Sequence, residues 1–151
     1  MTRPLTIVSL ILSIAGIAVA GYLTYVHYNL GALVCGIGDC ETVQASKYSE
    51  VFGIPIAILG LVAYIALAGL IVARATMPDY ADFASLAILF ILITGTLYYI
   101  YLTYLELKVI YAVCQWCVIS FIITVLLLTV ELVRFRRSMN EVDTGFDATE
   151  G

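Results

Sequence analysis

Four cysteines are the residues of this sequence best suited to chemistry, and they fall into two pairs. Cys35 and Cys40 are separated by four residues, two of them glycines, whereas Cys114 and Cys117 form a CxxC motif. A mobile pair beside a fixed pair permits disulfide exchange, in which a thiolate of one pair attacks a sulfur of the other. The chain has one histidine, which argues against a histidine-based metal site. The spacing therefore indicates thiol–disulfide exchange.

The CxxC motif lies at the start of a predicted helix. Positions i and i+3 share a helix face, so the two sulfurs can reach each other. Cys114 is expected in the first turn, where free N–H groups and the helix dipole favour a thiolate. Cys117 then lies about 4.5 Å deeper along the helix axis. This asymmetry gives an outer sulfur for exchange with thiols and an inner sulfur for a lipid-soluble oxidant.

The elements that must position these pairs are membrane-spanning helices. The chain is 63% hydrophobic and 12% charged, whereas soluble proteins are about half apolar and about a quarter charged. Four uncharged runs of about 20 residues can each cross a roughly 30 Å hydrocarbon layer as a helix. The spans are expected at 5–25, 54–73, 83–105 and 111–132. The sequence thus predicts an all-α, integral membrane four-helix bundle in a single domain, 1–137, followed by a disordered tail, 138–151.

The first apolar run also imitates a signal peptide. Arg3, an apolar stretch and the small residues Ala18–Ala20 match that pattern. However, the run continues to Tyr25, which is longer than a usual signal core. It also carries a stripe of small residues suited to close helix packing, namely Ser9, Ser13, Gly16 and Ala20. We therefore expect a retained span.

Positive charges predict the orientation of the bundle. One side of the four-span plan carries five arginines, and the other carries only two lysines. By the positive-inside rule, both termini and the tail lie in the cytoplasm of a multi-pass inner or plasma membrane protein. The long loop His27–Gly53 and all four cysteines then face the periplasm or exterior, where disulfides persist. No basic patch suggests a nucleic-acid partner; membrane lipid is the expected surrounding. The arginines are Arg3, Arg74, Arg134, Arg136 and Arg137, and the lysines are Lys47 and Lys108.

Two other interpretations of the cysteines remain open. Two disulfides could simply staple the outer loops of a non-enzymatic four-helix membrane protein, although a CxxC disulfide within one helix staples almost nothing. The four thiolates could instead hold a structural zinc ion, since spacings of four and two residues suit zinc. One pair lies at membrane depth without polar surroundings, which argues against the metal.

The order of features resembles the vitamin K epoxide reductase family in its bacterial and archaeal stand-alone form. The matching stretches are Cys35–Gly60 and Cys114–Cys117. They contain a loop cysteine pair, then Ser46, then Phe52–Pro55 opening the second span, and finally a CxxC at the outer end of the last span. The other family of quinone-linked disulfide generators carries its CxxC in the first loop, so the order here argues against it.

This resemblance implies a role for each cysteine. Cys114 and Cys117 would be the active-site pair, with Cys117 nearest a quinone such as ubiquinone or menaquinone. Cys35 and Cys40 would be the shuttle pair, Cys40 exchanging with Cys114 and Cys35 with an outside partner. That partner is expected to be a thioredoxin-fold protein acting in trans, and no metal is implied. The implied function is a membrane thiol–disulfide oxidoreductase that passes electrons to quinone and supports disulfide bond formation.

Three residues are candidates for quinone binding. Ser46 matches the family's loop serine beside the quinone pocket, or else is a turn cap. Phe121 stands where the vertebrate enzymes have a tyrosine, and the missing hydroxyl favours quinone reduction over epoxide reduction. Tyr101 belongs to a group of tyrosines on the cysteine side that could wall such a pocket, or could form an ordinary aromatic belt at the membrane interface.

Overall fold

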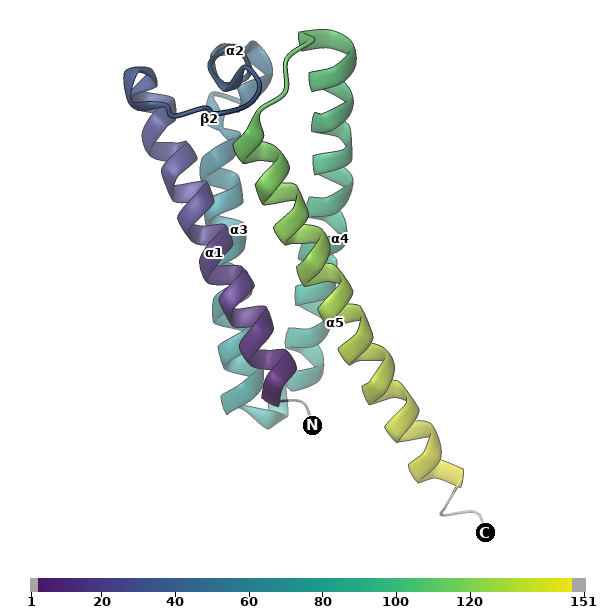
Figure 1. The fold of residues 1–151 in the computed structure, drawn as a ribbon. Coiled ribbons are helices and arrows are strands. Elements are labelled where there is room, and N and C mark those ends of the chain that lie inside the picture. The colour runs from purple at the N-terminus through teal and green to yellow at the C-terminus, as the bar shows by residue number, and fades with distance from the viewer. Residues whose placement is uncertain (1–2, 148–151) are drawn as a thin grey trace.

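A computed structural model describes residues 3–147, and four long helices make up its body (Figure 1). They are α1 (Arg3–Tyr28), α3 (Ile56–Thr76), α4 (Ala81–Leu105) and α5 (Gln115–Asp147). Each is long and apolar enough to cross a membrane. The predicted all-α, four-span architecture is therefore confirmed, with a cysteine-bearing loop between the first two spans.

The connection between α4 and α5 differs from the sequence prediction. A π-helical turn, η4 (Glu106–Ile110), follows α4, and Tyr111 ends it in a left-handed conformation with φ of 55°. The chain then runs without helical structure, so α5 begins at Gln115 and not near residue 111. Cys114 therefore precedes the helix, and its carbonyl accepts a hydrogen bond from the backbone N–H of Val118 at 3.1 Å.

The other difference lies at the end of α5. Residues 138–147, expected to be disordered, continue this helix as far as Asp147. Adding a residue to an existing helix gains one hydrogen bond per residue fixed, and no proline interrupts this stretch. The last part of the expected tail, 148–151, lies outside the described residues.

The long helices pack around one apolar core, in which α1 contacts both α3 and α5. The stripe of small residues on α1 faces inward, since Ser9, Ser13, Gly16 and Ala20 are all buried. A Cβ atom on Gly16 would lie 2.3 Å from the ring of Tyr64, so only glycine admits that ring. The core comprises Ala20, Tyr64, Leu67, Ile71, Ile88, Leu92, Ile123 and Leu127.

A buried ion pair joins the helices at the end opposite the cysteines. Arg74 of α3 donates two hydrogen bonds to Glu131 of α5, at 2.6 and 3.0 Å. Ser9 of α1 donates a third to the same carboxylate, at 2.6 Å. Both charges are almost fully buried, so each depends on the other for compensation.

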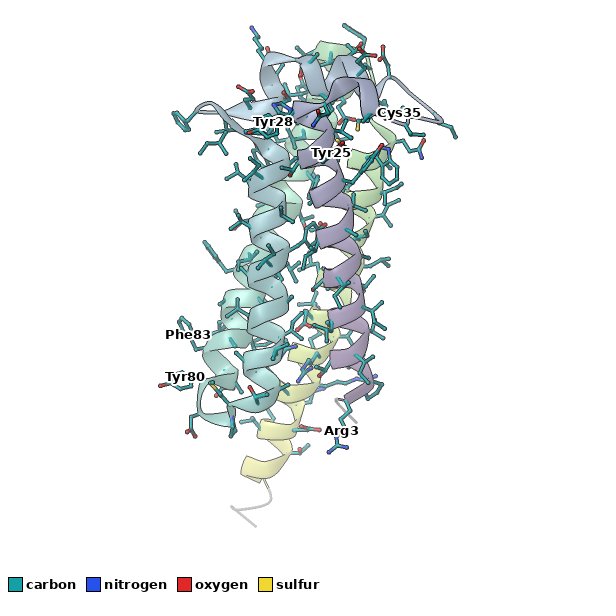
Figure 2. The ribbon with its side chains drawn as sticks, turned by 90° about the vertical axis from the view of Figure 1, so that its left-hand side faces the viewer. Arg3, Tyr25, Tyr28, Cys35, Tyr80 and Phe83 are labelled. Atoms are coloured by element: carbon teal, nitrogen blue, oxygen red, sulfur yellow. A yellow bond between two sulfur atoms is a disulfide. The ribbon has the colours of Figure 1, made fainter. Side chains whose placement is uncertain are left out.

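The loop between α1 and α3 covers the other end of the bundle (Figure 1). It contains two short 3-10 turns, η1 (Leu30–Ala32) and η2 (Lys47–Ser49), and the helix α2 (Cys40–Ala45). A two-stranded antiparallel hairpin, β1 (Glu50–Val51) and β2 (Ile54–Pro55), then leads into α3. Figure 2 places Cys35, Tyr25 and Tyr28 at this end, and Arg3, Tyr80 and Phe83 at the opposite end. A third 3-10 turn, η3 (Pro78–Tyr80), joins α3 to α4.

Asp39 caps the N-terminus of α2. Its carboxylate accepts hydrogen bonds from the backbone N–H and the hydroxyl of Thr42, at 3.2 and 2.7 Å. These bonds hold the pKa of Asp39 below its usual value. The cap fixes the first turn of α2, which carries Cys40.

Candidate active site

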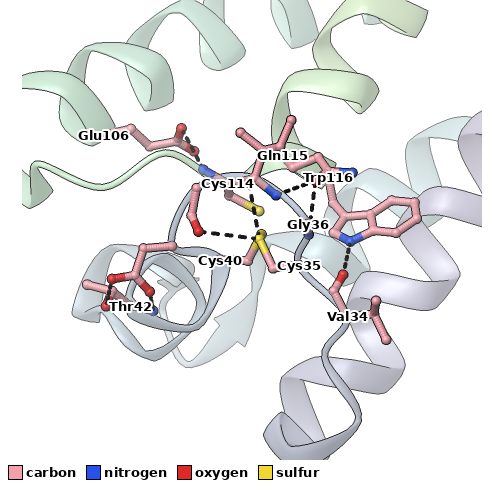
Figure 3. Close-up of a disulfide and its surroundings, with 12 residues drawn as sticks. Val34, Cys35, Gly36, Cys40, Thr42, Glu106, Cys114, Gln115 and Trp116 are labelled. Atoms are coloured by element: carbon pink, nitrogen blue, oxygen red, sulfur yellow. Dashed lines mark hydrogen bonds between the residues drawn. A yellow bond between two sulfur atoms is a disulfide. The ribbon is translucent and has the colours of Figure 1, made fainter.

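The two cysteine pairs lie in one cluster, with Cys114 beside the Cys35–Cys40 disulfide (Figure 3). Cys35 and Cys40 form a disulfide with an S–S distance of 2.08 Å, and Cys114 and Cys117 are free thiols. Gly38 forms a β-bridge with Cys114, in which the N–H of Asp39 donates to the carbonyl of Val113 at 3.0 Å. The loop disulfide thus lies against the CxxC motif, although the pairs are far apart in the sequence.

The four cysteines differ in their exposure. Cys35 is partly exposed, whereas Cys40 and Cys114 are fully buried in one cluster. Cys117 is half-buried and lines a cavity inside the bundle. The arrangement therefore leads from an accessible loop sulfur, through two buried residues, to a thiol at the cavity.

The two middle residues of the CxxC motif hold the loop in place. The side-chain oxygen of Gln115 accepts hydrogen bonds from the backbone N–H groups of Gly36 and Ile37, at 3.2 and 3.0 Å. The indole N–H of Trp116 donates to the carbonyl of Val34 at 2.9 Å. Sequence reasoning missed these contacts, because they join residues about 80 positions apart and follow no periodic pattern.

The CxxC thiols interact directly with each other. The Cys117 thiol donates a hydrogen bond to the Cys114 sulfur and holds the pKa of Cys114 below its ordinary value, although burial acts in the opposite direction. Cys114 is therefore the better thiolate. A thiolate at this position is the state needed for exchange with a neighbouring disulfide.

A cavity lies beneath the loop, between α1, α3, α4 and α5. Its volume is about 70 Å³, which is below the range of about 300–1,000 Å³ typical of sites for drug-sized ligands, so a ring-sized ligand would have to widen it. The lining is mainly apolar, as expected for a site that accepts a lipid-soluble ring. The polar and titratable residues in the lining are Gln44, Ser46, Tyr48, Ser49, Tyr99, Glu106, Cys117 and Ser120.

The three predicted quinone contacts differ in their position relative to the cavity. Ser46 lines the cavity, and it also fits the capping interpretation, because its hydroxyl donates to the carbonyl of Val43 at 2.8 Å. Tyr101 does not line the cavity and is exposed on the outer face of the bundle, so its assignment stays a prediction. Phe121 is not in the lining either; it stacks on Tyr99, with ring centroids 5.8 Å apart.

Hydroxyl groups form a network at the cavity wall that sequence reasoning did not identify. The Tyr99 hydroxyl is 2.6 Å from the Ser120 hydroxyl, which is 3.1 Å from that of Tyr64. Tyr64 also lies 2.8 Å from the hydroxyl of Thr124. Because Ser120 follows Cys117 by three residues, helical spacing was the signal that could have pointed to it.

Glu106 is the second residue that was missed, because it was expected in a short exterior turn. In the structure its side chain is only 6% exposed. One carboxyl oxygen is 3.4 Å from the backbone nitrogen of Cys114, and the carboxyl group also interacts with the Cys117 thiol. An acidic residue directly after an apolar run, eight residues before a CxxC motif, was the available signal.

The arrangement does not match the zinc alternative. The sulfurs of Cys35 and Cys40 are bonded to each other, so four free thiolates are not available. Within residues 3–147, no group of three or more histidine, cysteine, aspartate or glutamate residues could hold a metal ion.

The structure holds a disulfide against a free dithiol at one end of four membrane-spanning helices. This is the arrangement that a membrane thiol–disulfide oxidoreductase requires. The sequence profile of the vitamin K epoxide reductase family matches residues 7–132, which is most of the chain. The chain belongs to this family, and the resemblance found in its cysteine and loop motifs is confirmed.

Proposed function

We propose that this protein oxidises a thioredoxin-fold partner and passes the electrons through its two cysteine pairs to a quinone. The observation that carries the proposal is the contact between the loop disulfide and the CxxC motif, with Cys117 at a cavity. In this way the protein supports disulfide formation in other proteins.

The first step is exchange at the accessible end of the loop disulfide. A thiolate of the partner attacks Cys35, which is partly exposed, and Cys40 leaves as a thiolate. The partner's second thiolate then attacks the sulfur bonded to Cys35. The partner leaves as a disulfide, and the loop pair holds two electrons as a dithiol.

The second step is exchange between the pairs. The Cys40 thiolate attacks Cys114 in an oxidised Cys114–Cys117 pair, forming a Cys40–Cys114 bond and releasing Cys117 as a thiolate. Cys35 then attacks Cys40, which restores the loop disulfide and releases Cys114. The product is a loop disulfide beside a CxxC dithiol, which is the combination that the structure contains.

The final acceptor is a quinone such as ubiquinone or menaquinone. The apolar lining of the cavity suits a flat apolar ring, which would widen the cavity on entry, and the hydroxyls of Tyr99 and Ser120 offer hydrogen bonds at its wall. Conversion of the Cys114–Cys117 dithiol to a disulfide supplies the two electrons and two protons that turn a quinone into a hydroquinone. Phe121 lacks the hydroxyl of the vertebrate enzymes, which favours quinone over epoxide as the substrate.

The cysteine end of the bundle is proposed to face away from the cytoplasm. Arg3 lies at the opposite end (Figure 2), and α1 begins and α5 ends there (Figure 1). The arginines concentrate at that end, and the positive-inside rule assigns such an end to the cytoplasm. The partner would then meet Cys35 in the periplasm or exterior.

A single substitution tests the route. Purified protein supplied with a reduced thioredoxin-fold protein should reduce a short-chain quinone, and Cys117→Ala should abolish that turnover. Val118→Ala, which alters the neighbouring lipid-facing residue, serves as the matched control. Turnover that survives in Cys117→Ala defeats the proposed route.

The same variant tests the order of exchange. Without Cys117, the bond between Cys40 and Cys114 cannot be resolved from the CxxC side, so this species should accumulate under non-reducing conditions. Mass spectrometry of peptides identifies the linked cysteines. A Cys35–Cys114 link in its place would reverse the roles of the two loop cysteines.

A further inference from the structure

Glu106 is a buried carboxyl group beside the CxxC motif, and the relay described above gives it no task. It lies in the π-helical turn η4, and its side chain is 6% exposed. One carboxyl oxygen is 3.4 Å from the nitrogen of Cys114 (Figure 3), and the group interacts with the Cys117 thiol. It also lines the cavity proposed for the quinone. Glu106 therefore contacts the CxxC motif and shares the cavity lining with Cys117.

The other buried glutamate shows what a purely structural carboxylate looks like in this chain. Glu131 accepts two hydrogen bonds from Arg74 and one from Ser9, so its charge is fully compensated. Glu106 takes part in neither of the ion pairs found within residues 3–147. Because no cation among the described residues compensates its negative charge, the buried carboxylate is a stronger base than an exposed one and takes up a proton readily. Glu106 is thus suited to gaining and losing a proton.

No lysine, arginine or histidine occurs among the described residues that line the cavity. Lys108 belongs to the same turn, but its side chain is exposed. The titratable groups next to the Glu106 carboxyl are Cys114 and Cys117 of the CxxC motif, and Tyr99 of α4 and Tyr48 of the loop line the same cavity. Of these, Cys117 is a thiol that must lose its proton during the reaction.

We propose that Glu106 is a catalytic residue that accepts the proton of the Cys117 thiol and delivers it into the cavity. The inference rests on the proposed function. When the Cys114–Cys117 dithiol becomes a disulfide, one sulfur–sulfur bond forms, two S–H bonds break and two electrons leave. One proton passes from Cys117 through Glu106, and the second leaves from Cys114. The quinone is the oxidant that takes up both electrons and both protons.

Glu106→Gln separates this role from simple capping. The amide oxygen of glutamine can still accept the N–H of Cys114, but the side chain cannot take up a proton. The rate of quinone reduction in a single turnover should fall by about 10²–10⁴-fold at neutral pH, the usual contribution of a positioned base. It should recover with rising pH, because hydroxide replaces the missing base. Exchange between the loop pair and Cys114 should keep its normal rate.

Glu41→Gln is the matched control, because Glu41 is an exposed acid on α2, outside the cavity lining. It should behave like the natural protein at every pH. Glu106→Asp keeps a carboxyl group on a shorter side chain and should recover part of the lost rate. Formation of the Cys35–Cys40 disulfide and the thermal unfolding midpoint report whether each variant folds.

A second measurement needs no quinone. Infrared difference spectra between the dithiol protein and protein oxidised with diamide should contain a carboxyl C=O band that is absent in Glu106→Gln. If this variant reduces quinone at the normal rate at every pH, and the band persists in it, Glu106 is only a cap and the inference is overturned. If the natural protein reduces no quinone at all, the proposed function fails, and the infrared band still decides the role of Glu106.

Discussion

Gly38→Ala is predicted to release the loop disulfide from the CxxC motif. Gly38 has φ of +90°, and a Cβ atom there would lie 2.2 Å from the carbonyl oxygen of Val113. A left-handed conformation costs a non-glycine residue about 1–2 kcal/mol. The carbonyl of Val113 belongs to the backbone and cannot rotate away from the added Cβ atom. The hydrogen bond from the Asp39 N–H to this carbonyl is therefore lost, which costs about 1 kcal/mol. The total is about 2–3 kcal/mol.

This energy converts into a measurable loosening. At about 1.4 kcal/mol per factor of ten, the equilibrium constant between the docked and the released loop falls by about 30- to 150-fold. Hydrogen–deuterium exchange at the Asp39 amide, followed by mass spectrometry, should accelerate by that factor. Exchange between Cys40 and Cys114 should slow, whereas quinone reduction by chemically reduced Cys114–Cys117 should stay unchanged.

Two control variants separate strain from contact. Gly31→Ala meets nothing within 4 Å and has no unusual φ, so it should leave exchange unchanged. Gly53→Ala has φ of +79° with nothing within 4 Å, and therefore adds strain in the hairpin without touching the site. An Asp39 amide as protected in Gly38→Ala as in Gly31→Ala would refute the reasoning that the β-bridge holds the loop.

Three further predictions concern the rest of the molecule. Arg74→Met alone should cost about 3–5 kcal/mol of stability because it strands a buried charge, and adding Glu131→Leu should restore most of it; a double-mutant cycle of denaturation in mixed micelles measures both. Tyr99→Phe removes a hydroxyl that makes a 2.6 Å hydrogen bond at the cavity wall, and should raise KM for quinone by about 2- to 12-fold with little change in kcat. Cys117→Ala should raise the pKa of Cys114, which the absorbance of the thiolate measures. The hydrogen bond from Cys117 is the main cause that lowers this pKa in the natural protein, so the Cys114 thiolate persists to lower pH only while that donor is present.

The spans could be predicted because lipid imposes a simple rule on sequence. An uncharged run of about 20 residues has few alternatives to a membrane helix, and all four runs became long helices. The meeting of the cysteine pairs also followed from topology, since Cys35 and Cys114 flank spans that end on the same side. These conclusions needed only length and connectivity.

The cavity residues could not be predicted, because helices in lipid are apolar on every face. Tyr99 and Tyr101 are two positions apart on α4 and so point about 200° away from each other. One lines the cavity and the other is exposed, and no polar stripe in the sequence distinguishes them. The non-helical residues before α5 could not be predicted either, because tertiary contacts set the left-handed conformation of Tyr111 and the β-bridge between Cys114 and Gly38.

Gln115 and Trp116 separate the two thiols of the CxxC motif and also bind the loop that carries the disulfide. The same four residues therefore carry the reactive thiols and bind the loop. Exchanging this dipeptide for one from another thiol enzyme would alter delivery and reactivity together. Engineers who wish to retune the redox potential of this protein must work from the surrounding helices and leave the dipeptide intact.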